Sequence, residues 1–119
     1  MDPIVTASLI IIVLVILCLI HQQSQPKVVV VLFYAEWCPA CQGFLPTWQQ
    51  LKNNLPSGVK LVEVNEKDKE HMSQKEKELG TQVMSFPWIM ISSSKGTERY
   101  TGPRDFQSMM DYLSRMNVL

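Results

Sequence analysis

The sequence has little of several residue types, and each shortage argues against a class of protein. Its 119 residues carry 11 basic and 11 acidic side chains, so the formal net charge is zero. No basic block or stripe is present, which argues against a nucleic-acid partner. Three cysteines are too few to hold a small secreted domain together through disulfides. Without internal repeats, the length suits one compact domain with one core.

Charge is also absent from residues 4–20, which read IVTASLIIIVLVILCLI. As a helix this run would rise about 25 Å, the short end of a membrane span. Asp2 and Pro3 before it suit the cap and the first residue of a helix. We therefore expect residues 1–26 to form an N-terminal transmembrane anchor with a short linker, in contact with the lipid bilayer through residues 4–20.

Two other interpretations of this segment fit less well. A cleaved signal peptide would have a basic region before the apolar run and a small-residue cleavage site after it, and both are missing. A buried core helix would show apolar periodicity, whereas apolar residues here cover every face. Orientation rests on Lys27, a slight excess of positive charge that favours a cytoplasmic C-terminal domain but leaves the side of the membrane open.

Residues 27–119 alternate between strand and helix patterns. KVVVVLFYAEW, which begins at Lys27, is a continuous run of apolar and β-branched residues, typical of a strand buried on both faces. Apolar residues then recur at steps of three and four from about Pro39 to Asn54, which predicts a helix. Its apolar stripe consists of Phe44, Leu45, Trp48, Leu51 and Leu55.

Three further strands and two further helices complete the pattern. Strands are expected at residues 59–64, from Trp88 and in TERYTG, with SSSKG as a hairpin loop between the last two. A highly charged helix ends at Gly80, and the final helix starts near Arg104. The alternation predicts parallel pairing, and the hairpin adds an antiparallel edge. The expected fold is α/β, a mixed four-stranded sheet with helices on both faces.

Cys38 and Cys41 follow the first strand directly. Cys38 falls at the N-terminus of a helix, where free backbone N–H groups and the helix dipole stabilise an anion. Its pKa should be lowered, so it is the expected attacking thiolate. Pro39 suits the first helical turn. Cys41 lies one turn along the same face and is more buried, where it can attack Cys38 and resolve a mixed disulfide.

Two other roles for the pair stay open on this reasoning: inert core residues, or half of a zinc site. A structural zinc site needs four ligands. Only Cys18, His21 and His71 remain as partners, and the first two belong to the membrane segment or its border. We therefore expect no metal site.

The residues around the pair resemble the thioredoxin superfamily. FYAEWCPAC is similar to the family's strand followed by CxxC, and Pro46 matches the proline that kinks the active-site helix. VMSFPW resembles the segment with the family's cis-proline, here Pro87. YTGPR is similar to the end of the hairpin in protein disulfide-isomerase domains. The match covers roughly residues 27–119.

The resemblance implies thiol–disulfide exchange with protein clients. It makes Cys38 the nucleophile and Cys41 the resolver, paired as a Cys38–Cys41 disulfide when oxidised. It makes Pro87 a cis residue that shapes the client groove. Trp37, Phe86 and Trp88 are expected to line that groove, with simple packing as the alternative role of Trp37 and Trp88. No bound cofactor is implied, but a separate electron donor or acceptor is, and we expect a monomer.

Two departures from the family concern the fold and the proton relay. The usual first strand and helix are missing, because the anchor runs straight into the active-site strand. Leu32 replaces the family's buried acid six residues before the first cysteine. Glu63 in the next strand falls where thioredoxins have a lysine. We hypothesise that Glu63 supplies the missing carboxylate, with a pKa raised by burial so that it acts as a base. The alternative is that Glu63 simply reaches solvent at the edge of the sheet.

Two further departures concern the groove and the redox couple. Pro39-Ala40 contains no histidine to stabilise the thiolate, which predicts a more reducing couple than in isomerases. Trp88 follows Pro87 where a small hydroxyl residue is usual, which is expected to narrow the range of clients.

The function expected from the sequence is a membrane-tethered thiol–disulfide oxidoreductase. The alternative is a redox-inactive interaction module with the same fold, which Leu32 favours and the intact Cys38, Cys41 and Pro87 oppose. Small anchored domains of this kind also resemble thioredoxin-like proteins of large DNA viruses, so the membrane would be that of a host or a virion.

Overall fold

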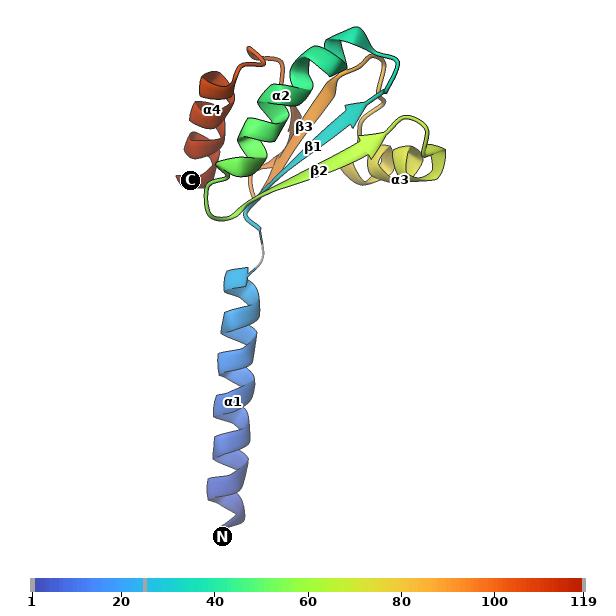
Figure 1. Cartoon of the computed structure of the whole chain (residues 1–119). Coiled ribbons are helices and arrows are strands. Elements are labelled where there is room, and N and C mark those ends of the chain that lie inside the picture. The colour runs from blue at the N-terminus through green and yellow to red at the C-terminus, as the bar shows by residue number, and fades with distance from the viewer. Residues whose placement is uncertain (1, 25, 119) are drawn as a thin grey trace.

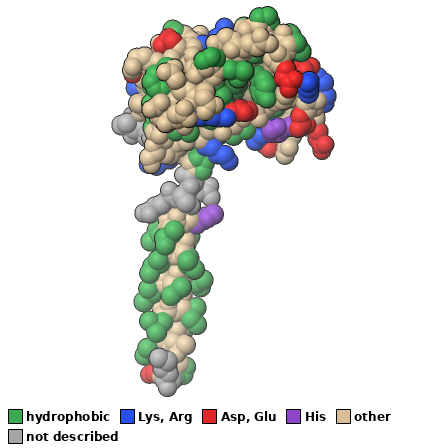
Figure 2. Space-filling view, viewed as in Figure 1, with side chains coloured by type: hydrophobic (Ala, Val, Ile, Leu, Met, Phe, Trp, Pro, Cys, Tyr) green, Lys and Arg blue, Asp and Glu red, His purple; other side chains and the backbone are tan. Residues whose placement is uncertain are grey.

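A computed structural model describes residues 2–24 and 26–118. The first helix, α1 (Pro3–Ser24), starts where the Asp2 carboxylate accepts a hydrogen bond from the Ile4 N–H group (3.1 Å). Its apolar side chains are exposed all round, and it projects from one end of the domain (Figures 1 and 2). The helix is long and apolar enough to cross a membrane, a property that N-terminal signal sequences share.

Four strands form one mixed sheet in the order β2-β1-β3-β4. They are β1 (Val28–Tyr34), β2 (Val59–Asn65), β3 (Trp88–Ser93) and β4 (Gly96–Arg99). β1 pairs with β2 in parallel and with β3 antiparallel, and β4 closes the hairpin. The predicted mixed sheet is confirmed. In the described part of the chain β2 is an edge strand, as expected of a thioredoxin-like sheet without its usual first strand.

Three helices cover the sheet, close to the predicted bounds: α2 (Pro39–Asn53), α3 (Lys69–Leu79) and α4 (Phe106–Val118). α2 and α4 lie on one face and α3 on the other (Figure 1). No side chain of α3 is fully buried, which agrees with its highly charged sequence, and Met72 and Leu79 are partly buried against the core. It ends at Gly80, whose positive φ of 63° is left-handed and therefore suits glycine.

The core has two parts because β1 is covered on both faces. Val30 and Leu32 point to the α2 and α4 side, where Trp48 and Leu51 of α2 pack against them. Phe33 and its neighbours point to the α3 side. This second part consists of Val31, Phe33, Val64, Trp88 and Met90. The prediction of a strand buried on both faces is confirmed, and the strand leads directly into the cysteine pair.

Candidate functional site

The cysteine pair lies where β1 passes into α2. The Cys38 N–H group donates to the Ala35 carbonyl (3.2 Å), and Cys38 caps α2 with its side chain, followed by Pro39 in the first turn. The Cys38 sulfur accepts a hydrogen bond from the Cys41 backbone N–H group (3.2 Å). Backbone N–H groups in the first turn of a helix have no partner within the helix. A sulfur that accepts a hydrogen bond from such a group is stabilised as a thiolate anion.

The environment moves the pKa values of the two thiols in opposite directions. The hydrogen bond from the Cys41 side chain lowers the pKa of Cys38, and backbone N–H groups of the first turn add to this. Burial raises the pKa of Cys41 to about 11, and the bond to Cys38 adds to the shift. Cys38 is therefore the thiol that ionises first, and Cys41 keeps its proton at neutral pH.

The segment around Pro87 faces the pair, as the sequence predicts. The Phe86–Pro87 peptide bond is cis. The Cys38 thiol donates to the Phe86 carbonyl (3.5 Å), which places this loop against the sulfur. Trp37 is 66% exposed and meets the Phe86 ring edge to face, with centroids 6.0 Å apart. An exposed aromatic surface thus lies beside Cys38.

Trp88 lies deeper than the other aromatic residues of this region. It is 9% exposed and belongs to the core on the α3 side. The Arg99 guanidinium stacks on its ring, 3.6 Å from the centroid. Within the described residues its Nε1–H group has no hydrogen-bond partner. Its part in client binding stays a prediction.

Glu63 lies beside Leu32 in the sheet register, as expected, but its environment differs from the hypothesis. Its carboxylate pairs with Lys52 of α2 and accepts a hydrogen bond from Trp48 Nε1 (2.8 Å). The bond to Lys52 is the main reason why its pKa is lowered. The side chain is 37% exposed, because β2 is an edge strand. The predicted raised pKa is therefore wrong, since Lys52 supplies the partner that the sequence argument left out.

Arg104 is a site residue to which the sequence analysis gave no role. Its positive charge contributes to lowering the pKa of both Cys38 and Cys41. It lines a hollow of about 370 Å³ together with Phe86 and Pro87. The signal was present in YTGPR, where the arginine directly follows the hairpin segment.

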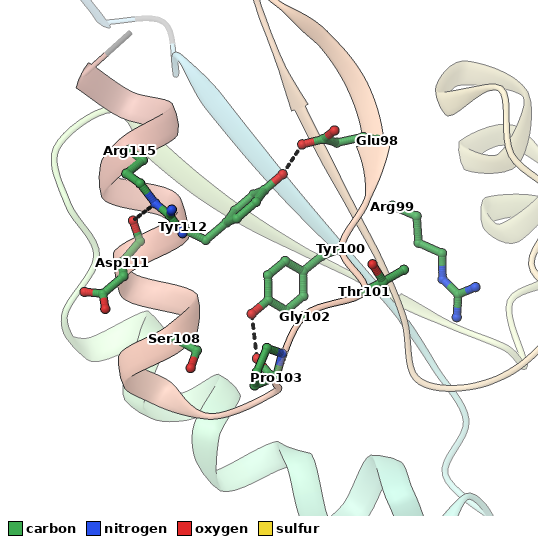
Figure 3. Close-up of a pocket in the computed structure, with 10 residues that line it drawn as sticks. All are labelled: Glu98, Arg99, Tyr100, Thr101, Gly102, Pro103, Ser108, Asp111, Tyr112 and Arg115. Carbon is green, nitrogen blue, oxygen red and sulfur yellow. Dashed lines mark hydrogen bonds between the residues drawn. The ribbon is translucent and has the colours of Figure 1, made fainter.

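The loop before Arg104 borders a second hollow, of about 430 Å³, and contacts between the residues of this region hold the loop in place (Figure 3). The Tyr100 hydroxyl donates to the Pro103 carbonyl (2.5 Å), and the Tyr100 ring meets that of Tyr112 edge to face. A Cβ atom at Gly102 would lie 2.9 Å from the Tyr100 hydroxyl oxygen, so any larger residue there would have to displace the Tyr100 ring. These contacts fix the loop that presents Arg104.

Metal-ligating side chains do not gather in groups of three or more within residues 2–24 and 26–118.

Comparisons with known proteins agree with this geometry. The Thioredoxin family profile matches residues 20–115. The chain belongs to the thioredoxin family. It is 30% identical over 91 residues to protein disulfide isomerase-like 1-1 of Arabidopsis thaliana, and 31% identical over 96 residues to a protein disulfide-isomerase of Datisca glomerata. These matches cover 75% and 79% of this chain.

The structural comparison shows the same fold. The J-Trx1 fragment of ERdj5 superposes with a TM-score of 0.61 and 23% identity, over 75% of this chain and 42% of the fragment. The two disulfide-isomerase relatives are much longer, since the match covers only 18% and 19% of their lengths. The predicted thioredoxin-like fold is thereby confirmed.

The contribution of Arg104 can be tested by its replacement. Arg104→Gln should raise the pKa of Cys38, so less thiolate is present at neutral pH. Alkylation of Cys38 should slow by about two- to threefold, because solvent screens most of the effect of an exposed charge. The rate is measured with iodoacetamide against pH. Arg99→Gln removes an equal charge from the same hollow as a control, and an equal effect there would contradict the specific role of Arg104.

The correction for Glu63 gives a second prediction. Glu63→Gln should lower stability at neutral pH by at most about 1 kcal/mol, because a half-exposed ion pair is weak. Since the folded-state pKa is lowered, this contribution exists above the unfolded-state pKa and disappears as pH falls through the folded-state pKa. Unfolding in urea at several pH values measures it.

Glu63→Gln should also leave the rate of disulfide exchange with the same dependence on pH between about pH 6 and pH 9, the range in which a general base would titrate. Lys52→Gln, which breaks the same ion pair, serves as the matched control. A profile displaced by Glu63→Gln and not by Lys52→Gln would show that the carboxylate takes part in proton transfer.

Proposed function

We propose that the chain is a membrane-tethered thiol–disulfide oxidoreductase that reduces disulfides of protein clients through Cys38 and Cys41. The observation that carries the proposal is the pair of thiols at the start of α2 with pKa values moved in opposite directions. The family and the disulfide-isomerase relatives support the same type of reaction.

The proposed reaction transfers two electrons from the dithiol to a client disulfide. The Cys38 thiolate attacks one client sulfur, the client S–S bond breaks, and the second client sulfur leaves as a thiolate and takes a proton. Cys41 then loses its proton and attacks the Cys38 sulfur. This step releases the first client sulfur as a thiolate, which is also protonated, and leaves a Cys38–Cys41 disulfide. A separate thiol donor must reduce that disulfide, and no bound cofactor is needed.

Client binding is assigned to the surface around the pair. The exposed ring of Trp37 and the neighbouring Phe86 offer apolar contact beside the Cys38 sulfur. Pro87 and Arg104 border the adjoining hollow. Trp88 would act by supporting this surface from beneath, since it is largely buried.

We assign the membrane tether to residues 1–26 and the redox domain to residues 27–119. We expect the protein to act as a monomer. α1 supports this, because it is apolar along its membrane-length stretch. Confinement to a bilayer raises the effective concentration of the dithiol for clients at the same membrane. We predict that this membrane belongs to a host cell or to a virion.

The reducing direction is supported by the residues between the cysteines. Pro39 and Ala40 provide no imidazolium, and a less stabilised thiolate makes the disulfide less oxidising. A cytoplasmic location, which Lys27 favours, would supply reducing thiols.

A redox-inactive interaction module is the second candidate. The observation that favours it is Leu32, which is fully buried where the family has an acid and cannot relay a proton to Cys41. Under this alternative, clients would bind to the same surface without forming a mixed disulfide.

A trapping experiment separates the two candidates. Cys41→Ser should accumulate mixed disulfides between Cys38 and client proteins, because the resolving step is lost. The adducts are detected on non-reducing gels as species that dithiothreitol removes. The Cys38→Ser/Cys41→Ser variant is the control, and Cys18→Ser in both variants excludes adducts of the third cysteine. Client binding with no adduct at Cys38 would establish the interaction module instead.

A further inference from the structure

The end of the sheet where β1 begins lies next to α1. Val28 is level with Val59 at the start of β2 and with Ser93 at the end of β3. The β3–β4 hairpin is therefore at this end too. The last turn of α4 joins it, since Met116 lines a hollow with Lys95 of the hairpin. We call this the anchor end of the domain (Figure 1).

The anchor end is basic. Lys27, Lys60, Lys95 and Arg115 are all exposed there, from four separate parts of the fold. None of these four forms an ion pair with a carboxylate among the described residues. Figure 2 shows blue side chains on the underside of the domain, next to the linker.

Acidic side chains near this end offset the four cations only in part. Glu63 is paired with Lys52, whereas Glu98 lines the hollow with Lys95 and accepts a hydrogen bond from Tyr112, which adds no positive charge. Asp111 lies one helical turn before Arg115, away from the last turn of α4. A chain with zero net charge thus carries an unbalanced positive surface at one end.

Of the other seven basic side chains, Lys52, Lys67, Lys69 and Lys75 form ion pairs, whereas Lys77, Arg99 and Arg104 form none among the described residues. On and beside α3, Lys69 pairs with Glu66 and Lys75 pairs with Glu78. Paired surface charges largely cancel at a distance, whereas unpaired lysines on one surface add up. The anchor end, with four unpaired cations next to α1, is therefore suited to an extended anionic surface, whereas Arg99 and Arg104 lie at the hollow beside Phe86 and Pro87.

The dithiol lies at the opposite end of the same sheet. β1 runs from Val28 at the anchor end to Tyr34, a rise of about 20 Å at about 3.3 Å per residue. Cys38 follows Tyr34 closely, and Phe86 reaches it from the loop that precedes β3. Contact of the anchor end with a surface would leave the cysteine pair facing away from it.

We propose that the anchor end docks on anionic phospholipid headgroups of the bilayer that α1 crosses, so that the domain stands upright with Cys38 turned away from the membrane. This inference rests on the membrane tether of the proposed function. Basic side chains near such a surface are attracted within about 10 Å at about 0.1 M salt. Only residues 25–27 separate α1 from β1 in the sequence, so the anchor end is tied close to the bilayer that α1 crosses.

The orientation specifies how a client must be presented. Its disulfide has to lie about one domain height above the bilayer, on a soluble protein or on the distal part of a membrane protein. Disulfides at the membrane surface would be out of reach. The anionic leaflet is the cytoplasmic one, so docking also assigns the domain to that side.

Energy transfer from the domain to labelled headgroups tests this orientation. The full chain, with Cys18, Cys38 and Cys41 each replaced by Ser, is labelled through Met84→Cys near the dithiol or through Ser94→Cys in the hairpin. It is reconstituted in phosphatidylcholine vesicles with or without phosphatidylserine. Phosphatidylserine should lower transfer from position 84 and raise transfer from position 94, and both shifts should shrink between about 0.1 M and about 1 M salt.

Charge variants complete the experiment. Lys27→Gln/Lys60→Gln/Lys95→Gln should abolish both shifts. The matched control Lys69→Gln/Lys75→Gln/Lys77→Gln removes as many lysines from the neighbourhood of α3 and should retain them. The docking would be overturned if energy transfer were equal with and without phosphatidylserine. It would also be overturned if both triple variants lost the two shifts to the same extent.

Flotation of the same vesicles at high pH separates this inference from the tether. Chain that floats with the vesicles but shows no shift refutes the docking and leaves the tether intact. Chain that is stripped from the vesicles refutes both, whereas the trapping experiment with Cys41→Ser still tests the redox reaction.

Discussion

The hydrogen bond from the Cys41 N–H group to the Cys38 sulfur is the contact on which the site depends. It exists because a strand buried on both faces ends at the point where α2 begins, so Cys38 must serve as the helix cap. The same geometry buries Cys41 one turn further along and raises its pKa. One junction thus produces a thiol that ionises readily and a second thiol that holds its proton.

The sheet carries this junction to one end of the domain and the tether to the other. Parallel pairing of β1 and β2 puts both of their starts beside α1 and both of their ends beside the cysteines. The cis Phe86–Pro87 segment and the Arg104 loop approach the pair from β3 and from the start of α4. The fold therefore separates a redox end from an anchor end, and four unpaired cations lie at the anchor end.

Much of the fold and the centre of the site could be predicted because they follow from local patterns. The apolar run before Cys38, the helical stripe after it and Gly80 at the end of α3 each act within a few residues. The position of Glu63 beside Leu32 was also predictable from strand alignment. Its pKa was not, because that depends on Lys52, a side chain from another element that reaches the strand edge.

Arg104 is a second residue whose role depends on contacts between separate elements of the fold. Its motif is visible in the sequence, but its effect on the thiols depends on a loop held by Tyr100 and Tyr112. The basic anchor end could not be predicted either, because its four cations come from distant positions that only the sheet and α4 bring together.

The reduction potential of the Cys38–Cys41 couple tests the central claim most directly. The full chain would be equilibrated with glutathione redox buffers in detergent, and the fraction of intramolecular disulfide measured after acid quenching. A reductase with this site should give a value near −270 mV, about that of thioredoxin. A value near about −120 mV would contradict the reducing direction, and the absence of a disulfide at every potential would contradict the redox function itself.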